Sequence, residues 1–172
     1  LLEDNCESLG AKYDNKFTGT IGNVGTFSFF FSHHMQTMEG GMLVTNNKKT
    51  YELANSMRAH GWIRDLPDDN SLFKKTGDNF EDSFKFITPG YSIRPLEMSG
   101  AIGSVQLRKI NSFIDNRREN AKFFNELFKS NENIIIQRET GESSWFGFSI
   151  VLKNKFLGKR SEILKKLSNA NI

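Results

Sequence analysis

Two adjacent histidines, His33 and His34, stand in the stretch of this sequence whose residue types are best suited to chemistry. Ser28 precedes them, and Glu39-Gly40-Gly41 follows them. Histidine is the side chain most easily tuned for proton transfer near pH 7. The pattern alone leaves two interpretations open: a general base on a turn, or a core histidine that is hydrogen-bonded to the backbone.

Buried strands are expected on both sides of this turn. The runs 26–31 and 42–45 are short, apolar and β-prone, which predicts strands. Another strand is expected where Leu1-Leu2 leads into Glu3-Asp4. Ligands gather at the carboxyl ends of parallel strands in open α/β sheets, so Asp4 becomes a candidate site residue.

The rest of the chain alternates helical and extended patterns. A helix is expected over 48–59, and a long polar loop over 63–82. The apolar residues expected to face the core from this helix are Tyr51, Leu53, Ala54 and Met57. The later elements are expected in this order: a helix opened by Pro95, a longer helix after a break near Asn111, strands over 134–136 and 145–152, and a helix over 160–167.

Composition argues against several classes of protein. The chain has 172 residues, a net charge of +3 and 37% hydrophobic residues, which suffices for one ordinary core and part of a second. Basic and acidic residues alternate, so no nucleic-acid surface is expected. The single cysteine, Cys6, can form neither an internal disulfide nor an iron–sulfur cluster. No apolar run is long enough to span a membrane. We therefore expect a cytoplasmic protein without a metal site.

Four segments carry a resemblance to a known family. They are 28–41 with its histidine pair, Arg58-Ala-His60-Gly-Trp62, Gly90-Tyr-Ser-Ile-Arg94-Pro, and 139–148. With them the chain resembles the DegT/DnrJ/EryC/StrS family of sugar aminotransferases, which use pyridoxal phosphate. In that family a lysine stands at the position of His33. A histidine pair followed by Thr-Met-Glu-Gly-Gly is typical of the sugar 3-dehydratases within it.

The resemblance implies an α/β fold, the three-layer arrangement of the fold type I, aspartate-aminotransferase-like enzymes. Residues 1–110 would be part of the large cofactor-binding domain, 111–131 a linking helix, and 132–172 the start of the small C-terminal α+β domain. Members of this family are longer than this chain, so we expect an internal piece of a longer protein. The family also implies a homodimer whose active site lies between two subunits.

Besides His33, the resemblance assigns four residues to the cofactor. Asp4 would pair with the pyridine nitrogen and Ser28 with the phosphate, although by pattern alone each is an ordinary capping or turn residue. Glu7 would lie one helical turn after Asp4, where most members have a glutamine that covers the ring, and its role stays open. Ser92 replaces an asparagine that reaches the phosphate of the neighbouring subunit, so that contact stays open as well.

His33 is the residue to which the resemblance assigns catalysis. An imidazole can move protons, but it cannot form the stable imine that a lysine forms with the cofactor. We therefore expect pyridoxal or pyridoxamine phosphate to be held noncovalently, with His33 as the base. His34 is expected to pack elsewhere or to bind a backbone carbonyl.

Two arginines are candidate substrate-binding residues. Arg64 could meet the phosphates of a nucleotide or the carboxylate of an amino donor, because its forked guanidinium suits both groups. Arg94 lies in the motif where the family has Tyr-Asn-x-Arg. Phe80 and Phe84 could form an apolar wall on a partner subunit, with core packing as the simpler alternative.

The function implied is dehydration of a nucleotide-linked 4-keto-6-deoxysugar at C3, with GDP-4-keto-6-deoxymannose as the nearest substrate type. Such a reaction serves the synthesis of 3,6-dideoxysugars for the O-antigen of lipopolysaccharide, and glutamate would restore the amine form of the cofactor. The alternatives are a noncatalytic relative that has lost its lysine, and an ordinary sugar aminotransferase.

Overall fold

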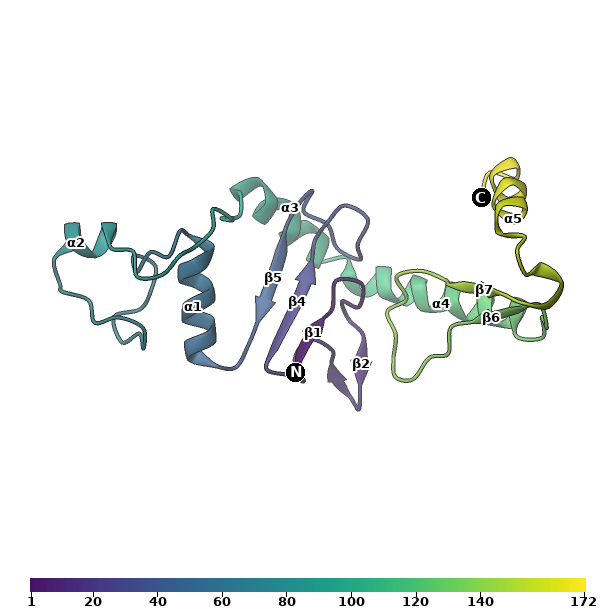
Figure 1. The fold of residues 1–172 in the computed structure, drawn as a ribbon, viewed down its shortest axis with the longest axis horizontal. Coiled ribbons are helices and arrows are strands. Elements are labelled where there is room, and N and C mark those ends of the chain that lie inside the picture. Colours follow the sequence, from purple (N-terminus) through teal and green to yellow (C-terminus); the bar gives the residue numbers. More distant parts are fainter.

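A three-stranded sheet lies near the middle of the molecule (Figure 1). At one edge it carries the segment 29–40, which contains His33 and His34 and is called the histidine loop below. The computed structural model describes residues 1–172. The strands are β1 (Leu2–Asp4), β4 (Val24–Ser28) and β5 (Gly41–Val44), in the order β1-β4-β5. Because β1 and β4 are parallel and β5 is antiparallel to β4, the histidine loop begins beside the carboxyl end of β1.

A small hairpin lies between β1 and β4 in the sequence. It pairs β2 (Lys12–Tyr13) with β3 (Lys16–Phe17). The carboxylate of Glu3 accepts hydrogen bonds from three backbone N–H groups in the segment that returns to β4, those of Gly19, Ile21 and Gly22. Glu3 therefore fixes the path of the chain into β4.

Helix α1 (Lys48–Arg58) confirms the predicted helix, but the predicted core face is wrong. Tyr51 and Leu53 are exposed, whereas Glu52 and Ser56 are buried. Glu52 is buried because its carboxylate accepts hydrogen bonds from the backbone N–H and the hydroxyl of Ser71, at 2.9 and 2.6 Å. This face of α1 therefore packs against the long polar loop rather than against an apolar core.

The long loop contains one short helix and leads into two longer ones. Helix α2 (Asn79–Phe84) is capped by the side chain of Asp78. Helix α3 (Glu97–Leu107) begins two residues after Pro95, because Leu96 is still extended, so the expectation that Pro95 lies in the first turn is wrong. Helix α4 (Ile110–Phe128) follows directly, and the break expected near Asn111 lies at 108–109.

The end of the chain extends away from the sheet along α4 (Figure 1). Strands β6 (Ile134–Ile136) and β7 (Ile150–Leu152) form an antiparallel pair, followed by the 3-10 turn η1 (Asn154–Phe156) and helix α5 (Arg160–Asn169). The predicted strand over 145–152 is confirmed only for its last three residues. Trp145 is buried in this part of the molecule and packs against Phe148. None of the helices is both long and apolar enough to cross a membrane. The division into domains at 110 and 131 stays a prediction.

Candidate active site

Asp4 ends β1 and is exposed at the edge where the histidine loop begins. Its Oδ1 accepts a hydrogen bond from the backbone N–H of Cys6 at 3.2 Å. Hydrogen bonds from the Cys6 thiol and then from the Cys6 backbone lower the pKa of Asp4 below its usual range. Asp4 is therefore a turn-forming residue, as the pattern alone allows, and an anion at neutral pH.

Ser28 lies on the same face of the sheet as Asp4. Asp4 is in register with Thr26 of the neighbouring parallel strand, and Ser28 follows Thr26 by two residues, so the three side chains point to one side. The Ser28 hydroxyl oxygen accepts from the Phe30 backbone N–H at 3.3 Å, and its proton has no acceptor within the chain. A carboxylate and a free hydroxyl donor are thus presented together.

His33 is half-buried, and two aromatic rings contact its imidazole. The centre of the Phe146 ring lies 5.2 Å from the centre of the imidazole, and that of Phe30 lies 6.0 Å away, edge-on at 81°. Nδ1 lies 3.5 Å from the hydroxyl oxygen of Ser32, a distance at the limit of a hydrogen bond. Nε2 makes no hydrogen bond within the chain and is free to exchange a proton.

His34 has a different environment from His33. Its side chain is buried, and its Nε2 lies 2.9 Å from the carbonyl oxygen of Ser144. A carbonyl can only accept, so Nε2 carries a proton and donates it. Burial lowers the pKa of His34, and its Nδ1 has no partner. The expectation that His34 binds a backbone carbonyl is confirmed.

Glu7 is near this site, but not on a helix as expected. Residues 5–10 form turns, in which the backbone N–H of Asn5 bonds to the Thr26 carbonyl and that of Ser8 to the Asn5 carbonyl. The charge of Glu7 is among the minor influences on the pKa of His34, which it raises, so Glu7 lies within electrostatic reach of the histidine loop. Its role as a cofactor contact stays a prediction.

Sequence reasoning missed Asn5, which organises this corner. The residue is buried, donates from Nδ2 to the Glu3 carbonyl, and accepts from the Ser8 hydroxyl at Oδ1. The available signal was its position: a polar residue directly after a buried strand end often caps the turn that follows. Asn5 thereby fixes the backbone on the far side of Asp4.

The predicted substrate residues form a second group around Trp62. The Arg64 guanidinium lies 4.0 Å from the centre of the Trp62 ring and that of Arg94 lies 5.9 Å from it. Arg64 also donates to the Ser83 carbonyl through Nε and Nη2. Ser92 pairs with Ala59 at the end of α1. No hydrogen bond, ion pair or aromatic contact joins this group to Asp4, Ser28 or His33.

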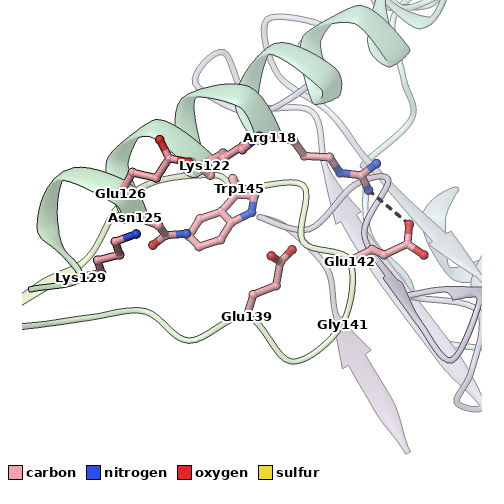
Figure 2. Close-up of a pocket in the computed structure, with 10 residues that line it drawn as sticks. Arg118, Lys122, Asn125, Glu126, Lys129, Glu139, Gly141, Glu142 and Trp145 are labelled. Atoms are coloured by element: carbon pink, nitrogen blue, oxygen red, sulfur yellow. Dashed lines mark ion pairs between the residues drawn. The ribbon is translucent and has the colours of Figure 1, made fainter.

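A hollow of about 490 Å³ lies between α4 and the segment 139–145 (Figure 2). Arg118 and Glu142 face each other across one end of it, at 3.9 Å. Its lining carries charges of both signs and contains none of the predicted site residues. The edge of the sheet, rather than this hollow, is therefore the candidate active site.

The edge of the sheet suits a phosphorylated pyridine such as pyridoxal or pyridoxamine phosphate. Asp4 is an anion that can pair with a protonated ring nitrogen, and Ser28 has a free proton for a phosphate oxygen. No lysine occurs in the segment 28–41. The residues present therefore fit a cofactor that is bound noncovalently.

Comparison with known proteins shows the family to which the chain belongs. The model of the DegT/DnrJ/EryC1/StrS aminotransferase family matches residues 1–172. The GDP-4-keto-6-deoxy-D-mannose 3-dehydratase of Yersinia pseudotuberculosis is 56% identical over the whole chain, which spans 44% of that protein.

Two solved structures are similar to the chain. A GDP-4-keto-6-deoxymannose-3-dehydratase variant with bound GDP-perosamine has a TM-score of 0.96 and 51% identity, over all of this chain and 45% of that one. A structure of such a dehydratase with a trapped PLP–glutamate geminal diamine has a TM-score of 0.94 and 50% identity, over 98% of this chain and 44% of that one. The chain thus spans less than half the length of these relatives.

Proposed function

Since the chain belongs to the DegT/DnrJ/EryC1/StrS aminotransferase family, we propose that it is part of a sugar 3-dehydratase. The substrate is a nucleotide-linked 4-keto-6-deoxysugar of the GDP-4-keto-6-deoxymannose type. One observation carries the proposal: His33, which the motif resemblance aligns with the family's lysine, has a free Nε2 and lies on the loop that starts beside Asp4 and Ser28.

Pyridoxamine phosphate, when bound, would delocalise the negative charge left by removal of a proton and would supply the electron pair that expels the C3 hydroxyl. The Asp4 carboxylate holds the proton on the pyridine nitrogen by its charge. The Ser28 hydroxyl binds a phosphate oxygen. His33 would accept and return a proton at Nε2, which makes no hydrogen bond within the chain. Without a lysine in this loop, an ordinary aminotransferase mechanism lacks its nucleophile.

The residues around Trp62 are proposed to act in an active site shared between two subunits. Arg64, Arg94 and Ser92 lie apart from His33 within one chain. We assign the two arginines to the nucleotide phosphates, and we assign Ser92 to the cofactor phosphate of a second subunit. A homodimer with shared active sites would bring the two groups together.

Glutamate is the proposed amino donor, as the similar enzyme with a trapped PLP–glutamate adduct suggests. The product, a 3,6-dideoxy-4-keto sugar nucleotide, would serve the synthesis of lipopolysaccharide O-antigen. We place the reaction in the cytoplasm, with which a single unpaired cysteine is consistent.

The test is a product analysis with the full-length protein. GDP-, CDP- and dTDP-linked 4-keto-6-deoxysugars are each incubated with pyridoxal phosphate and glutamate, and the products are identified by mass spectrometry. We expect the GDP-linked sugar to lose its C3 oxygen. Transfer of an amino group to C4 with C3 intact would instead identify an aminotransferase.

A further inference from the structure

The segment 142–146 is held in place by parts of the chain that are far apart in sequence. The backbones of Glu142 and Lys12 exchange two hydrogen bonds, of 2.8 and 2.9 Å. Three side chains then donate to consecutive carbonyls: Arg118 to Ser143, His34 to Ser144, and Arg117 to both Trp145 and Phe146, all at 2.9–3.0 Å. The β2 hairpin, the histidine loop and α4 therefore meet on these five residues.

The two aromatic residues at the end of this segment make different contacts. Trp145 is buried and lines the hollow beside α4 (Figure 2). Phe146 instead packs its ring against the imidazole of His33. Trp145 has a φ of +50°, which is uncommon for a bulky residue and persists only where the surroundings enforce it. The two hydrogen bonds from Nη1 of Arg117 to the carbonyls of Trp145 and Phe146 provide that enforcement.

His33 depends on packing for its orientation. Its ring has one contact at the limit of a hydrogen bond, with Ser32, and no second polar partner within the chain. The aromatic contacts of the ring are with Phe30, edge-on at 81°, and with Phe146, which is tilted by 50°. The ring of Phe31, which packs against Phe30, is exposed. Phe146 is thus the contact that the rest of the fold holds most firmly.

We propose that Phe146 is a positioning residue for His33, and that the segment 142–146 acts through it. The inference rests on the proposed role of His33 as the base. The ring restricts the imidazole to one orientation, and Arg117 restricts the ring by holding its backbone. A misplacement of a catalytic group by about 1 Å can lower a rate on the order of a hundredfold, so a small loss of order here affects turnover.

Phe146→Leu in the full-length enzyme tests the inference, because leucine keeps an apolar side chain but removes the flat ring. We expect kcat to fall about ten- to a hundredfold, with KM for the sugar nucleotide changed less than about twofold. Phe146→Tyr restores the ring and should recover most of kcat. Thermal unfolding of each variant shows whether the fold is retained.

Phe128→Leu is the matched control. Phe128 ends α4, packs against Phe124 at 4.9 Å, and makes no ring contact with His33 or with the segment 142–146. This variant should keep kcat within about twofold of the parent enzyme, since it removes a similar ring from the neighbouring part of the fold without touching the imidazole. An equal loss of kcat in Phe146→Leu and Phe128→Leu would overturn the positioning role.

Arg117→Met tests the path through the backbone, because methionine keeps an unbranched side chain but cannot donate to the Trp145 and Phe146 carbonyls, both of which bond to Nη1 of Arg117. Its loss of kcat should be less than additive with that of Phe146→Leu, as for residues that act through one another. Unchanged kcat in Phe146→Leu, with His33→Asn inactive, refutes this inference and leaves the proposed function intact. Full activity of His33→Asn would refute the proposed function itself.

Discussion

The imidazole of His34 is buried and donates to the Ser144 carbonyl, whereas that of His33 is half-buried with a free Nε2. The two residues are adjacent in the sequence, but their side chains differ in burial and in hydrogen bonding. Burial disfavours the charged form of His34, so this residue is a neutral structural donor. His33 keeps the access to solvent and ligand that a base needs.

His34 should make the stability of the protein depend on pH. Its pKa is lowered in the folded state, so between that lowered value and its ordinary pKa of 6.5 the unfolded chain binds more protons. The contribution of His34 to the free energy of unfolding should therefore be fully present above pH 6.5. It should decrease as the pH is lowered from 6.5 toward the pKa of His34 in the folded state. Urea unfolding at about pH 7 and about pH 5 measures this change.

His34→Gln removes the titrating group but keeps an N–H donor. The fall in the free energy of unfolding between about pH 7 and about pH 5 should be smaller in this variant than in the parent protein. The carboxylates with lowered pKa, including Glu3, Glu52 and Asp82, titrate below this window and act alike in both proteins. An unaltered pH dependence in His34→Gln would show that His34 is not the cause.

Because the histidine loop contains no lysine, we expect that borohydride reduction cannot link the cofactor covalently to this loop. The full-length protein is incubated with pyridoxal phosphate, reduced with borohydride and digested, and its peptides are weighed. The peptide with residues 28–41 should have its unmodified mass, because imidazole forms no stable imine. A cofactor adduct on this peptide would contradict noncovalent binding.

At the scale of the elements, α1 and the long loop form a unit through Glu52. Its buried carboxylate accepts both hydrogen bonds from Ser71 and lies 3.7 Å from the ammonium of Lys48. This arrangement fixes the base of the loop that carries Arg64 and the exposed rings of Phe80 and Phe84. The loop is therefore anchored, even though most of its residues are polar.

Glu52→Ala should loosen this loop, because it leaves the Ser71 N–H and hydroxyl without their acceptor. Amide hydrogen exchange should become faster at Ser71 and along 68–76, and limited proteolysis should cut the loop sooner. Glu81→Ala, which removes an exposed carboxylate from the same loop, is the control and should behave like the parent protein. Equal exchange rates at Ser71 in the Glu52→Ala variant and the parent would show that Glu52 does not anchor the loop.

The elements that the sequence predicted well are those with a local signal. The β-prone runs gave β4 and β5 within three residues of their ends, and the loop between them was recognised from its motif. The inward face of α1 was wrong because periodicity counts apolar residues, whereas this helix buries Glu52 and Ser56. A buried carboxylate whose partner lies 19 residues away leaves no periodic trace.

The segment 142–146 marks the limit of prediction from sequence. Only its last two residues were expected to begin a strand, and Arg117 and His34 bind its carbonyls from 28 and 110 residues away. Contacts of this range depend on how α4 and the histidine loop are placed together. The packing of Phe146 on His33 could therefore be found only in the folded molecule.

At the scale of the whole molecule, the family match and the TM-score of 0.96 confirm the aminotransferase fold that the motifs predicted. The structure separates the candidate residues into two groups, one at the sheet edge and one around Trp62. Separation within one chain is what a shared active site in a dimer requires. The dimer itself remains a proposal.

Mixing two inactive variants tests the shared site. His33→Asn and Arg94→Ala proteins are each assayed alone, and then after dissociation and reassociation at equal concentrations. If each site combines His33 of one subunit with Arg94 of the other, mixed dimers contain one intact site and the mixture should recover about a quarter of the parent activity. No recovery, with mixed dimers demonstrated by mass, would place both residues in the same subunit's site.

The central claim is that His33 is the base of a dehydration at C3, and turnover by His33→Asn tests it most directly. The full-length variant is supplied with GDP-4-keto-6-deoxymannose, cofactor and glutamate, and the 3-deoxy product is quantified by mass spectrometry alongside the amount of bound cofactor. The account predicts a loss of at least about a hundredfold in product formation, the range of a proton-transfer residue, with cofactor binding retained. Product formation at the parent rate, or loss of activity in His34→Asn alone, would contradict it.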